Sequence, residues 1–394
     1  MALLCGVCNG LLPFGRCIRY APDEPVTFND KGIKYMRKVN ILLSFGFGAW
    51  LLLLAACGSS AGENDSGVAA GTGGGAKARR KLVLAAYTTP REVYGRAIIP
   101  AFQRHWQQQS GQTLQFQESY MGSGAQSRAV EGGFEADVVA LSLEPDVLRL
   151  VDSGQITSSW NSDALGGMVS RSIVVIGVRR GNPLGIRDWH DLARSGIRVL
   201  TPNVKMSGGA MWNVMALYGA AIRGRIQGVP ANDENAAIAF LASVLANVRI
   251  MDKGARESLL SFEKGLGDVI ITYENEILLG RKAGKDYEYI VPAATVRIDN
   301  PAAVVDAHTA QHKTQDVAAA FVAFLRTPEV QAMYVTEGGL RPVVSDLAPA
   351  LTAHFPAVTD LFTVADLGGW SSVVPALFGT GGVYDKALAA ARKK

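Results

Sequence analysis

Cysteine is scarce in this chain and is confined to its first part. The four cysteines are Cys5, Cys8, Cys17 and Cys57, and none follows. Residues 58–394 therefore cannot form disulfide bonds with one another, so a fold in this region must depend on its hydrophobic core. With 394 residues, 48% of them hydrophobic, the chain is long enough for two domains of ordinary size.

An excess of charge of one sign is also missing. From Cys57 onward the chain has 33 Lys and Arg against 32 Asp and Glu. This balance argues against a polybasic protein that binds nucleic acid or a membrane surface. An anion bound by this region would have to be held by local dipoles and hydrogen bonds.

Recognisable catalytic motifs are absent as well. Ser123 does not lie in a Gly-x-Ser-x-Gly elbow, and residues 280–285 lack the spacing of a phosphate-binding loop. The spacing of His308 and His312 could place two imidazoles on one helical face for a metal, but it is more typical of a solvated surface. We expect a protein that is no enzyme and has no metal and no cofactor.

An apolar run near the N-terminus has the order of an export signal. Residues 36–38 are a methionine followed by a basic pair, residues 39–56 carry no charge, and Leu54-Ala55-Ala56 precedes Cys57. This resembles a bacterial lipobox, which implies that Cys57 is lipidated after cleavage. The alternative is a permanent anchor, because the run is close to the roughly 17 residues that span a membrane.

The segments on either side of Cys57 are expected to lack a core. Residues 1–56 are interpreted as an upstream extension and a signal peptide, with translation starting at Met1 or Met36. Cys5, Cys8 and Cys17 could form a metal or redox site, although the extension is expected to be untranslated or removed. Residues 57–80 are rich in Gly, Ala and Ser, which predicts a flexible tether behind the lipidated cysteine.

Beyond residue 80, short apolar runs alternate with helical patterns. Such alternation predicts mainly parallel sheets covered on both faces, and about 310 residues exceed one core, so we expect two α/β lobes. The predicted strands are 82–87, 113–117, 137–141, 172–179, 197–201, 248–251, 268–273, 287–291 and 303–306. The predicted helices are 91–109, 124–131, 145–151, 209–221, 233–246, 255–264, 314–325 and 328–337.

Three of the predicted strands run into a small-residue turn that opens a helix. These turns lie in residues 117–124, 201–209 and 250–256, at strand ends that can converge on one site. A helix N-terminus carries free N–H groups and partial positive charge, so each turn can hold an anion, or can simply be a helix cap. The candidate donors are the hydroxyls of Ser123 and Ser207 and the N–H groups of Ser123, Gly124, Gly208, Gly209 and Ala255.

None of these turns has a carboxylate at its tip. A fully ionised anion such as sulfate only accepts hydrogen bonds, whereas phosphate near neutral pH keeps a proton that needs an acceptor. A site made only of donors therefore favours sulfate. An inward-facing acid would weaken this preference, and the acids close in sequence are Glu118, Asp252, Glu257, Glu274 and Glu276.

Many short motifs between residues 81 and 385 resemble one known family. They include 87–94 (YTTPREVY), 132–139 (GGFEADVV), 180–183 (RGNP), 188–192 (DWHDL), 207–210 (SGGA), 254–256 (GAR), 267–269 (GDV), 274–276 (ENE), 328–331 (PEVQ), 340–342 (LRP) and 361–370 (LFTVADLGGW). In this order they are similar to the periplasmic sulfate-binding proteins of ABC importers. The resemblance implies a two-lobed type II periplasmic-binding-protein fold with the ligand between the lobes.

The resemblance also implies a ligand set and a division of the chain. Neutral donors hold dehydrated sulfate in this family, which by motif correspond to Ser123, Ser207, Gly208, Gly209 and Ala255. An indole N–H usually completes the set, but Tyr273 stands in its place here; likewise Met121, Thr88 and Met211 replace a usual Gly, Asp and Arg. By analogy the segments are 1–56, 57–80, 81–163 (lobe I), 164–272 (lobe II), 273–344 (lobe I) and 345–394 (returning to lobe II).

We therefore expect an exported, membrane-anchored lipoprotein that binds sulfate, or thiosulfate as well, and delivers it to an ABC permease. Its lobes should close on the ligand, and it should be a monomer that binds no nucleic acid. One alternative is the same kind of receptor for molybdate, tungstate or phosphate. Another is a surface enzyme that acts on sulfated or phosphorylated substrates. Arg256 could face the anion, but an ion pair outside the site is favoured.

Overall fold

The computed structural model describes residues 79–393, all of which belong to one compact unit. The expected export signal, Cys57 and the tether lie outside the described residues, apart from the last two residues of the expected tether, which open the first strand. Within residues 79–393, no helix is both long enough and apolar enough to cross a membrane.

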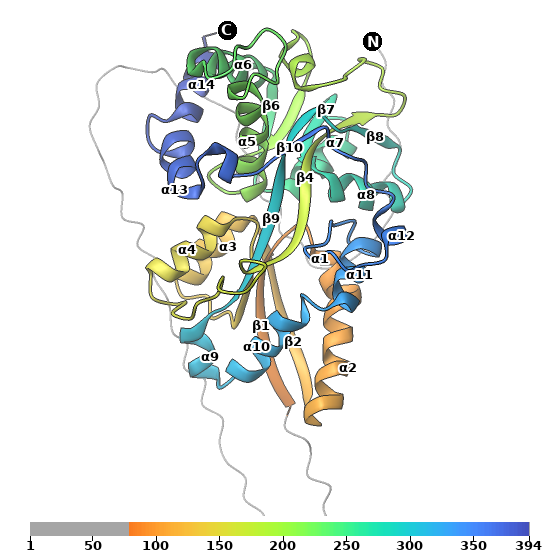
Figure 1. The fold of residues 1–394 in the computed structure, drawn as a ribbon, viewed down its shortest axis with the longest axis vertical. Coiled ribbons are helices and arrows are strands. Elements are labelled where there is room, and N and C mark those ends of the chain that lie inside the picture. Colours follow the sequence, from red (N-terminus) through yellow and green to blue (C-terminus); the bar gives the residue numbers. More distant parts are fainter. Residues whose placement is uncertain (1–78, 394) are drawn as a thin grey trace, which may run out of the picture. The chain divides into compact units, whose positions relative to one another are not determined.

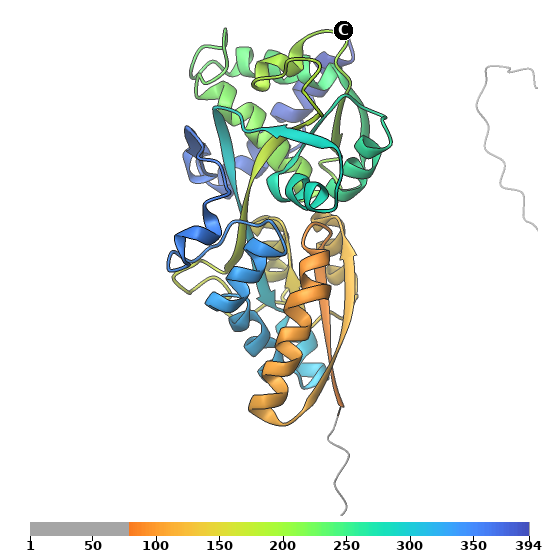
Figure 2. The same ribbon diagram turned by 90° about the vertical axis from the view of Figure 1, so that its right-hand side faces the viewer.

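The first lobe is built on a parallel sheet. β1 (Arg79–Tyr87) pairs with β2 (Thr113–Met121) on one side and β3 (Val138–Ala140) on the other. The last six residues of β1 are buried, as expected of a strand covered on both faces. Figure 2 shows α2 lying along β1 and β2. The helices of this lobe are α1 (Arg91–Val93), η1 (Tyr94–Ile98), α2 (Ile99–Ser110), α3 (Ser123–Glu131), α4 (Glu144–Asp152), α9 (Asp306–His312), α10 (Gln315–Phe324) and α11 (Pro328–Thr336).

The second lobe has its own parallel strands. β5 (Val199–Pro202) lies between β6 (Val248–Asp252) and β7 (Val269–Tyr273). The long helix α5 (Gly208–Ile222) contains no charged residue and is buried almost all round, because it packs between β9 (Ala294–Val304) and α6 (Glu234–Ala246). The other elements of this lobe are η2 (Trp189–Ala193), α7 (Ala255–Glu263), α8 (Glu274–Lys282), β8 (Tyr287–Ile290), η3 (Ala365–Leu367), α13 (Trp370–Val373), η4 (Val374–Phe378) and α14 (Val383–Ala391).

Two long antiparallel strands connect the lobes, β4 (Met168–Arg179) and β9 (Ala294–Val304). They run side by side through both lobes in Figure 1. The start of β4 pairs with β9, and its end pairs with β7 and β8 of the second lobe. The end of β9 pairs antiparallel with β3 of the first lobe. The strand order is β2-β1-β3-β9-β4-β7-β5-β6.

These pairings place the second crossing later in the chain than we expected. The expected crossing near residue 163 lies just before β4. The chain was expected to return to the first lobe near Tyr273. The elements after Tyr273 instead pack with the second lobe, because β8 pairs with β4 and Ile277 of α8 packs in the same core cluster as Ile270 of β7. The chain instead returns through β9. After α12 (Pro349–Thr352), β10 (Asp360–Phe362) pairs with β9 and α14 packs against α6.

Candidate functional site

Three helices begin at the ends of strands where the two lobes meet. α3 follows β2, α5 follows β5, and α7 follows β6. Their N-cap residues are Gly122, Ser207 and Gly254. The two glycines have no side chain to form a cap, and the Ser207 side chain makes no capping hydrogen bond. The first N–H groups of each helix are therefore not satisfied by a capping side chain.

Contacts between backbone loops show that the three helix starts lie close together. A Cβ added to Gly122 of the first lobe would lie 2.5 Å from the carbonyl oxygen of Met206 and 3.0 Å from that of Lys253, both in the second lobe. Only glycine allows this approach. The N–H of Ala125 also donates to the Met206 carbonyl at 3.4 Å. The lobes are therefore in contact at the candidate site.

The residues of the second lobe that were expected in the site are also brought together. A Cβ added to Gly209 would lie 3.4 Å from Ser207 Oγ, 3.4 Å from the Cβ of Ala255 and 2.8 Å from the ring of Tyr273. Ser207 is buried, and its hydroxyl has no hydrogen-bond partner within residues 79–393. Gly208, which opens α5, is buried beside it.

Ser123 is engaged differently from Ser207. Its hydroxyl donates to Asp146 Oδ2 at 2.5 Å and accepts from the N–H of Ser142 at 2.9 Å. Burial raises the pKa of Asp146 to about 6. The single hydroxyl hydrogen of Ser123 is thus already used, which leaves the N–H groups of Ser123 and Gly124 as the candidate donors of this loop.

Asp146 and Ser142 were missed by sequence reasoning. Both lie after β3, in a segment without the Gly and Ser turn that marked the other loops, and Asp146 falls in the first turn of α4. The position of Ser142 just past the end of β3 was the one signal that could have found it.

Ser142 of the first lobe is hydrogen-bonded to side chains of the second lobe. Its hydroxyl lies 2.6 Å from the Tyr273 hydroxyl, and the indole N–H of Trp212 donates to both its carbonyl oxygen and its Oγ at 3.1 Å. The side-chain amide of Asn300 in β9 donates to the same carbonyl at 3.1 Å. Burial raises the pKa of Tyr273, so its phenol stays neutral.

Four of the five acids that lie close in sequence to the turns have partners of their own. Glu274 pairs with Arg341 at 2.7 Å, and Glu276 pairs with Arg256 at 3.0 Å. Asp252 accepts from two serines of α7, and Glu118 accepts from Tyr120. For Glu257, a Cβ added to Gly254 would lie 2.5 Å from its carboxylate.

One arginine from each lobe reaches toward the other lobe. Arg256 of α7 pairs with Glu92 at 2.9 Å, which confirms its interpretation as an ion-pair residue. Arg128 of α3 donates to the carbonyl oxygen of Lys205 at 2.8 Å, just before Ser207. Arg128 also lines a cavity of about 290 Å³ beside the site, together with Gly124, Asp146, Ser207, Gly208 and Met211.

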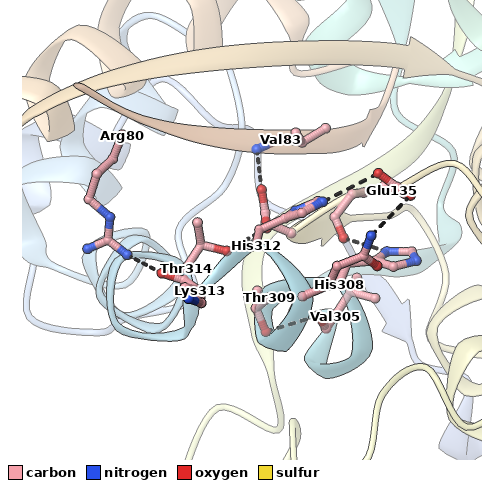
Figure 3. Close-up of polar contacts among 12 residues, drawn as sticks. Arg80, Val83, Glu135, Val305, His308, Thr309, His312, Lys313 and Thr314 are labelled. Carbon is pink, nitrogen blue, oxygen red and sulfur yellow. Dashed lines mark hydrogen bonds and ion pairs between the residues drawn. The ribbon is translucent and has the colours of Figure 1, made fainter. Parts of the chain in front are cut away.

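The two histidines with metal-like spacing lie far along the first lobe, in α9 (Figure 3). His308 Nδ1 lies 3.0 Å from the Ala136 carbonyl, and His312 lies between Asp137 at 2.9 Å and Glu135 at 3.4 Å. His308 is buried, so the expected solvated surface is wrong for this residue. Within residues 79–393, no group of three or more His, Cys, Asp or Glu side chains could hold a metal ion.

Comparisons with known proteins agree on one family. Residues 82–351 match the model of the bacterial extracellular solute-binding proteins. A sulfate-binding protein of Synechococcus elongatus is 40% identical over 86% of this chain and 93% of its own length. The sulfate-binding protein of Escherichia coli is 36% identical, and its thiosulfate-binding protein 33%, over 78% and 79% of this chain and 92% of each relative.

Solved structures agree with the fold. The sulfate-binding protein SubI from Mycobacterium tuberculosis is 39% identical and superposes with a TM-score of 0.69, covering 76% of this chain and 99% of that chain. A periplasmic thiamin-binding protein superposes with a TM-score of 0.58 at 14% identity, over 79% of this chain and 96% of its own. At that identity the second likeness supports the type II two-lobed fold alone.

Proposed function

Because the chain belongs to the family of bacterial extracellular solute-binding proteins, we propose that it captures sulfate between its lobes and delivers it to an ABC permease. One observation carries the proposal. Helices from both lobes begin at one place, and their first N–H groups are not satisfied by capping side chains. Together with the Ser207 hydroxyl they form a set of neutral donors suited to an anion.

The balance of donors and acceptors favours a fully ionised anion. The Asp146 carboxylate lies beside the loops, where its Oδ2 accepts the Ser123 hydroxyl and its Oδ1 would lie 3.6 Å from a Cβ added to Gly124. Its Oδ1 remains an acceptor, so the preference for a fully ionised anion rests on the number of neutral donors at the three helix starts. A protonated anion such as hydrogen phosphate would bring a donor into a site of donors, and an unmatched buried polar group is costly.

The proposed ligand contacts are those expected from the sequence. They are the N–H groups of Ser123, Gly124, Gly208, Gly209 and Ala255, the hydroxyl of Ser207, and Tyr273 at the edge of the site. Ser123 and Gly124 belong to the first lobe, whereas the others belong to the second. A ligand held by both groups gains its full contacts only when the lobes are closed, so binding shifts the population toward the closed form.

The cellular setting is proposed from the family together with the lipobox-like sequence before Cys57. We infer that the protein works outside the cytoplasm as a monomeric receptor, anchored to the membrane by a lipid on Cys57. The lobe boundaries that we propose use residues 168–179 and 294–304 as the connecting strands. Thiosulfate is a second candidate ligand, because a thiosulfate-binding protein is 33% identical to this chain.

Calorimetric titration of the protein with sulfate, thiosulfate, phosphate and molybdate tests the proposal. We expect tight binding of sulfate, weaker or equal binding of thiosulfate, and weak binding of phosphate. Phosphate or molybdate binding more tightly than sulfate would contradict the choice of ligand. Release of inorganic sulfate or phosphate from ester substrates would contradict a pure receptor and favour the surface enzyme.

A further inference from the structure

The hydroxyl groups of Ser142 and Tyr273 form a buried, hydrogen-bonded pair in which one hydroxyl hydrogen has no acceptor within the described residues. Each side chain is about 1% exposed, and their oxygens lie 2.6 Å apart. The pair holds two hydroxyl hydrogens, and the hydrogen bond between them uses one. Within residues 79–393, neither hydroxyl has a further acceptor. A buried donor without an acceptor is costly, so the remaining hydrogen points to an acceptor that is a ligand.

The surroundings decide which of the two hydroxyls keeps the free hydrogen. A phenol is a stronger acid than an aliphatic alcohol and is therefore the better hydrogen-bond donor. Tyr273 thus donates to Ser142, and the indole of Trp212 donates to the same oxygen at 3.1 Å. Both lone pairs of Ser142 Oγ are then occupied. The hydroxyl of Ser142 is left as a donor that cannot also accept.

Ser142 lies where an anion held by the helix starts would meet it. A Cβ added to Gly208 would lie 2.7 Å from Ser142 Oγ and 2.9 Å from its Cβ, so the side chain lies against the first residue of α5. On its other side, the Ser142 backbone N–H donates to Ser123 of the first lobe. The hydroxyl is therefore next to the proposed donors of both lobes.

We propose that Ser142 is a further anion-binding residue, whose hydroxyl donates to the bound oxyanion while Tyr273 and Trp212 donate to it. This inference rests on the proposed function and changes the role of Tyr273. Tyr273 becomes a positioning residue, which acts on the ligand through Ser142. Because Ser142 belongs to the first lobe and its two donors to the second, this arrangement exists only when the lobes are closed.

The test is a double-mutant cycle on the full-length chain, with sulfate affinity measured by calorimetry. We expect Ser142→Ala to weaken sulfate binding about tenfold, as for a lost hydrogen bond to a charged group. Tyr273→Phe should weaken it only about threefold, because Ser142 still donates but is less well oriented. The double variant should bind no worse than Ser142→Ala, because both substitutions remove one shared contact.

A matched control is Ser172→Ala in β4. Ser172 is also fully buried and bonds to a side-chain oxygen, that of Asn275, but it is not one of the proposed ligand contacts. We expect its sulfate affinity to equal that of the wild type. Thermal unfolding without ligand checks the fold of each variant, and the added stability in sulfate should shrink only for the site variants.

Several outcomes would overturn the inference. Ser142→Ala with wild-type affinity would remove Ser142 from the site. A larger loss for Tyr273→Phe than for Ser142→Ala, or additive losses in the double variant, would make Tyr273 a direct donor. If Ser142→Ala does not fold, Tyr273→Phe decides alone: a loss of about tenfold or more overturns the inference, and a loss of about threefold supports it. A wild type that binds no sulfate refutes the proposed function instead, and the same cycle is then read with the anion that does bind.

Discussion

Two buried aspartates in the first lobe show how differently polar groups are used in one molecule. Asp137 accepts hydrogen bonds from the N–H of Val83 at 2.7 Å, the hydroxyl of Thr314 at 2.6 Å and Nδ1 of His312 at 2.9 Å. Asp146 accepts from Ser123, but the neighbouring hydroxyls of Ser207 and of the Ser142–Tyr273 pair retain hydrogens without acceptors within residues 79–393.

The difference lies in the balance between donors and acceptors. Around Asp137 every donor meets an oxygen of the protein, so the network is complete and stabilises the fold. At the interlobe site the hydroxyl of Ser207 and one hydroxyl of the Ser142–Tyr273 pair keep a hydrogen without an acceptor within the described residues, so these hydrogen bonds are left for a ligand to make. Substitutions in the first region should therefore change stability, whereas those in the second should change binding.

The largest effect is expected from Asp137→Ala. This change leaves the N–H of Val83 and the hydroxyl of Thr314 buried without an acceptor, so the free energy of unfolding should fall by about 3 kcal/mol or more. Urea unfolding measures the loss, and calorimetry should show sulfate affinity unchanged. Asp286→Ala, which breaks an exposed pair with Arg180, is the control and should cost under about 1 kcal/mol. If Asp137→Ala changed the sulfate affinity without lowering the free energy of unfolding, Asp137 would contribute to binding and not to the stability of the fold.

Ser207→Ala should lower the sulfate affinity and leave the stability unchanged. Loss of its unpaired hydroxyl should weaken sulfate binding by roughly 1–3 kcal/mol, because a hydrogen bond to a charged group is lost. The stability of the ligand-free protein should not fall, because the hydroxyl has no partner to lose within the described residues. Calorimetry and unfolding of the same samples measure both quantities, and an unchanged affinity would exclude Ser207 from the site.

Arg128→Ala should have a smaller effect on binding. Its guanidinium donates across the lobes to the Lys205 carbonyl, which helps to hold the loop that bears Ser207. We expect sulfate to dissociate about fivefold faster, which corresponds to about 1 kcal/mol. Arg128→Lys keeps a charged donor and should retain most of the wild-type rate. Equal rates in all three proteins, measured by stopped-flow displacement, would show that this contact does not hold the closed form.

The smallest effect concerns His312 and depends on pH. Burial by itself lowers the pKa of His312, but the hydrogen bonds and charges of Asp137 and Glu135 leave it raised above its ordinary value. A raised pKa in the folded state stabilises the fold below the unfolded pKa of about 6.5, and this contribution is lost as the pH rises through the folded pKa.

His312→Gln should therefore lower stability more at about pH 5 than at about pH 9. Urea unfolding at both values gives the difference, and sulfate affinity serves as the control because His312 is remote from the site. A loss that is the same at both pH values would mean that the charge of His312 does not contribute.

The sequence predicted the parts of the molecule that have local signals. The predicted strand 113–117 and helix 124–131 follow from an apolar run that meets a Gly-Ser-Gly turn. The structure has both elements, as β2 and α3, although β2 continues four residues further than predicted. The three turns lie close together, whereas the ligand contacts of their donor residues stay a prediction. The start of β9 was missed, because Asn300 and Pro301 are poor strand formers and only its pairing with β4 holds them extended.

The least predictable part was the contact between residues far apart in the chain. Ser142 and Tyr273 are separated by 131 positions, and no local pattern marks either as a partner of the other. The contact between Asp146 and Ser123 was equally hard to predict, because an acid in the first turn of a helix is expected to interact with the positive end of that helix's dipole. Here it faces Ser123 of a neighbouring helix, which only the packing of α3 against α4 can show.

The indole of Trp212 has a practical consequence. Trp212 belongs to the second lobe, but its indole N–H donates to Ser142 of the first lobe. Separation of the lobes would therefore break this hydrogen bond and admit water to the ring. Tryptophan emission shifts to longer wavelength in water, so the fluorescence of this side chain is an intrinsic probe of whether the lobes are open or closed. Its signal would follow opening in real time without any attached dye.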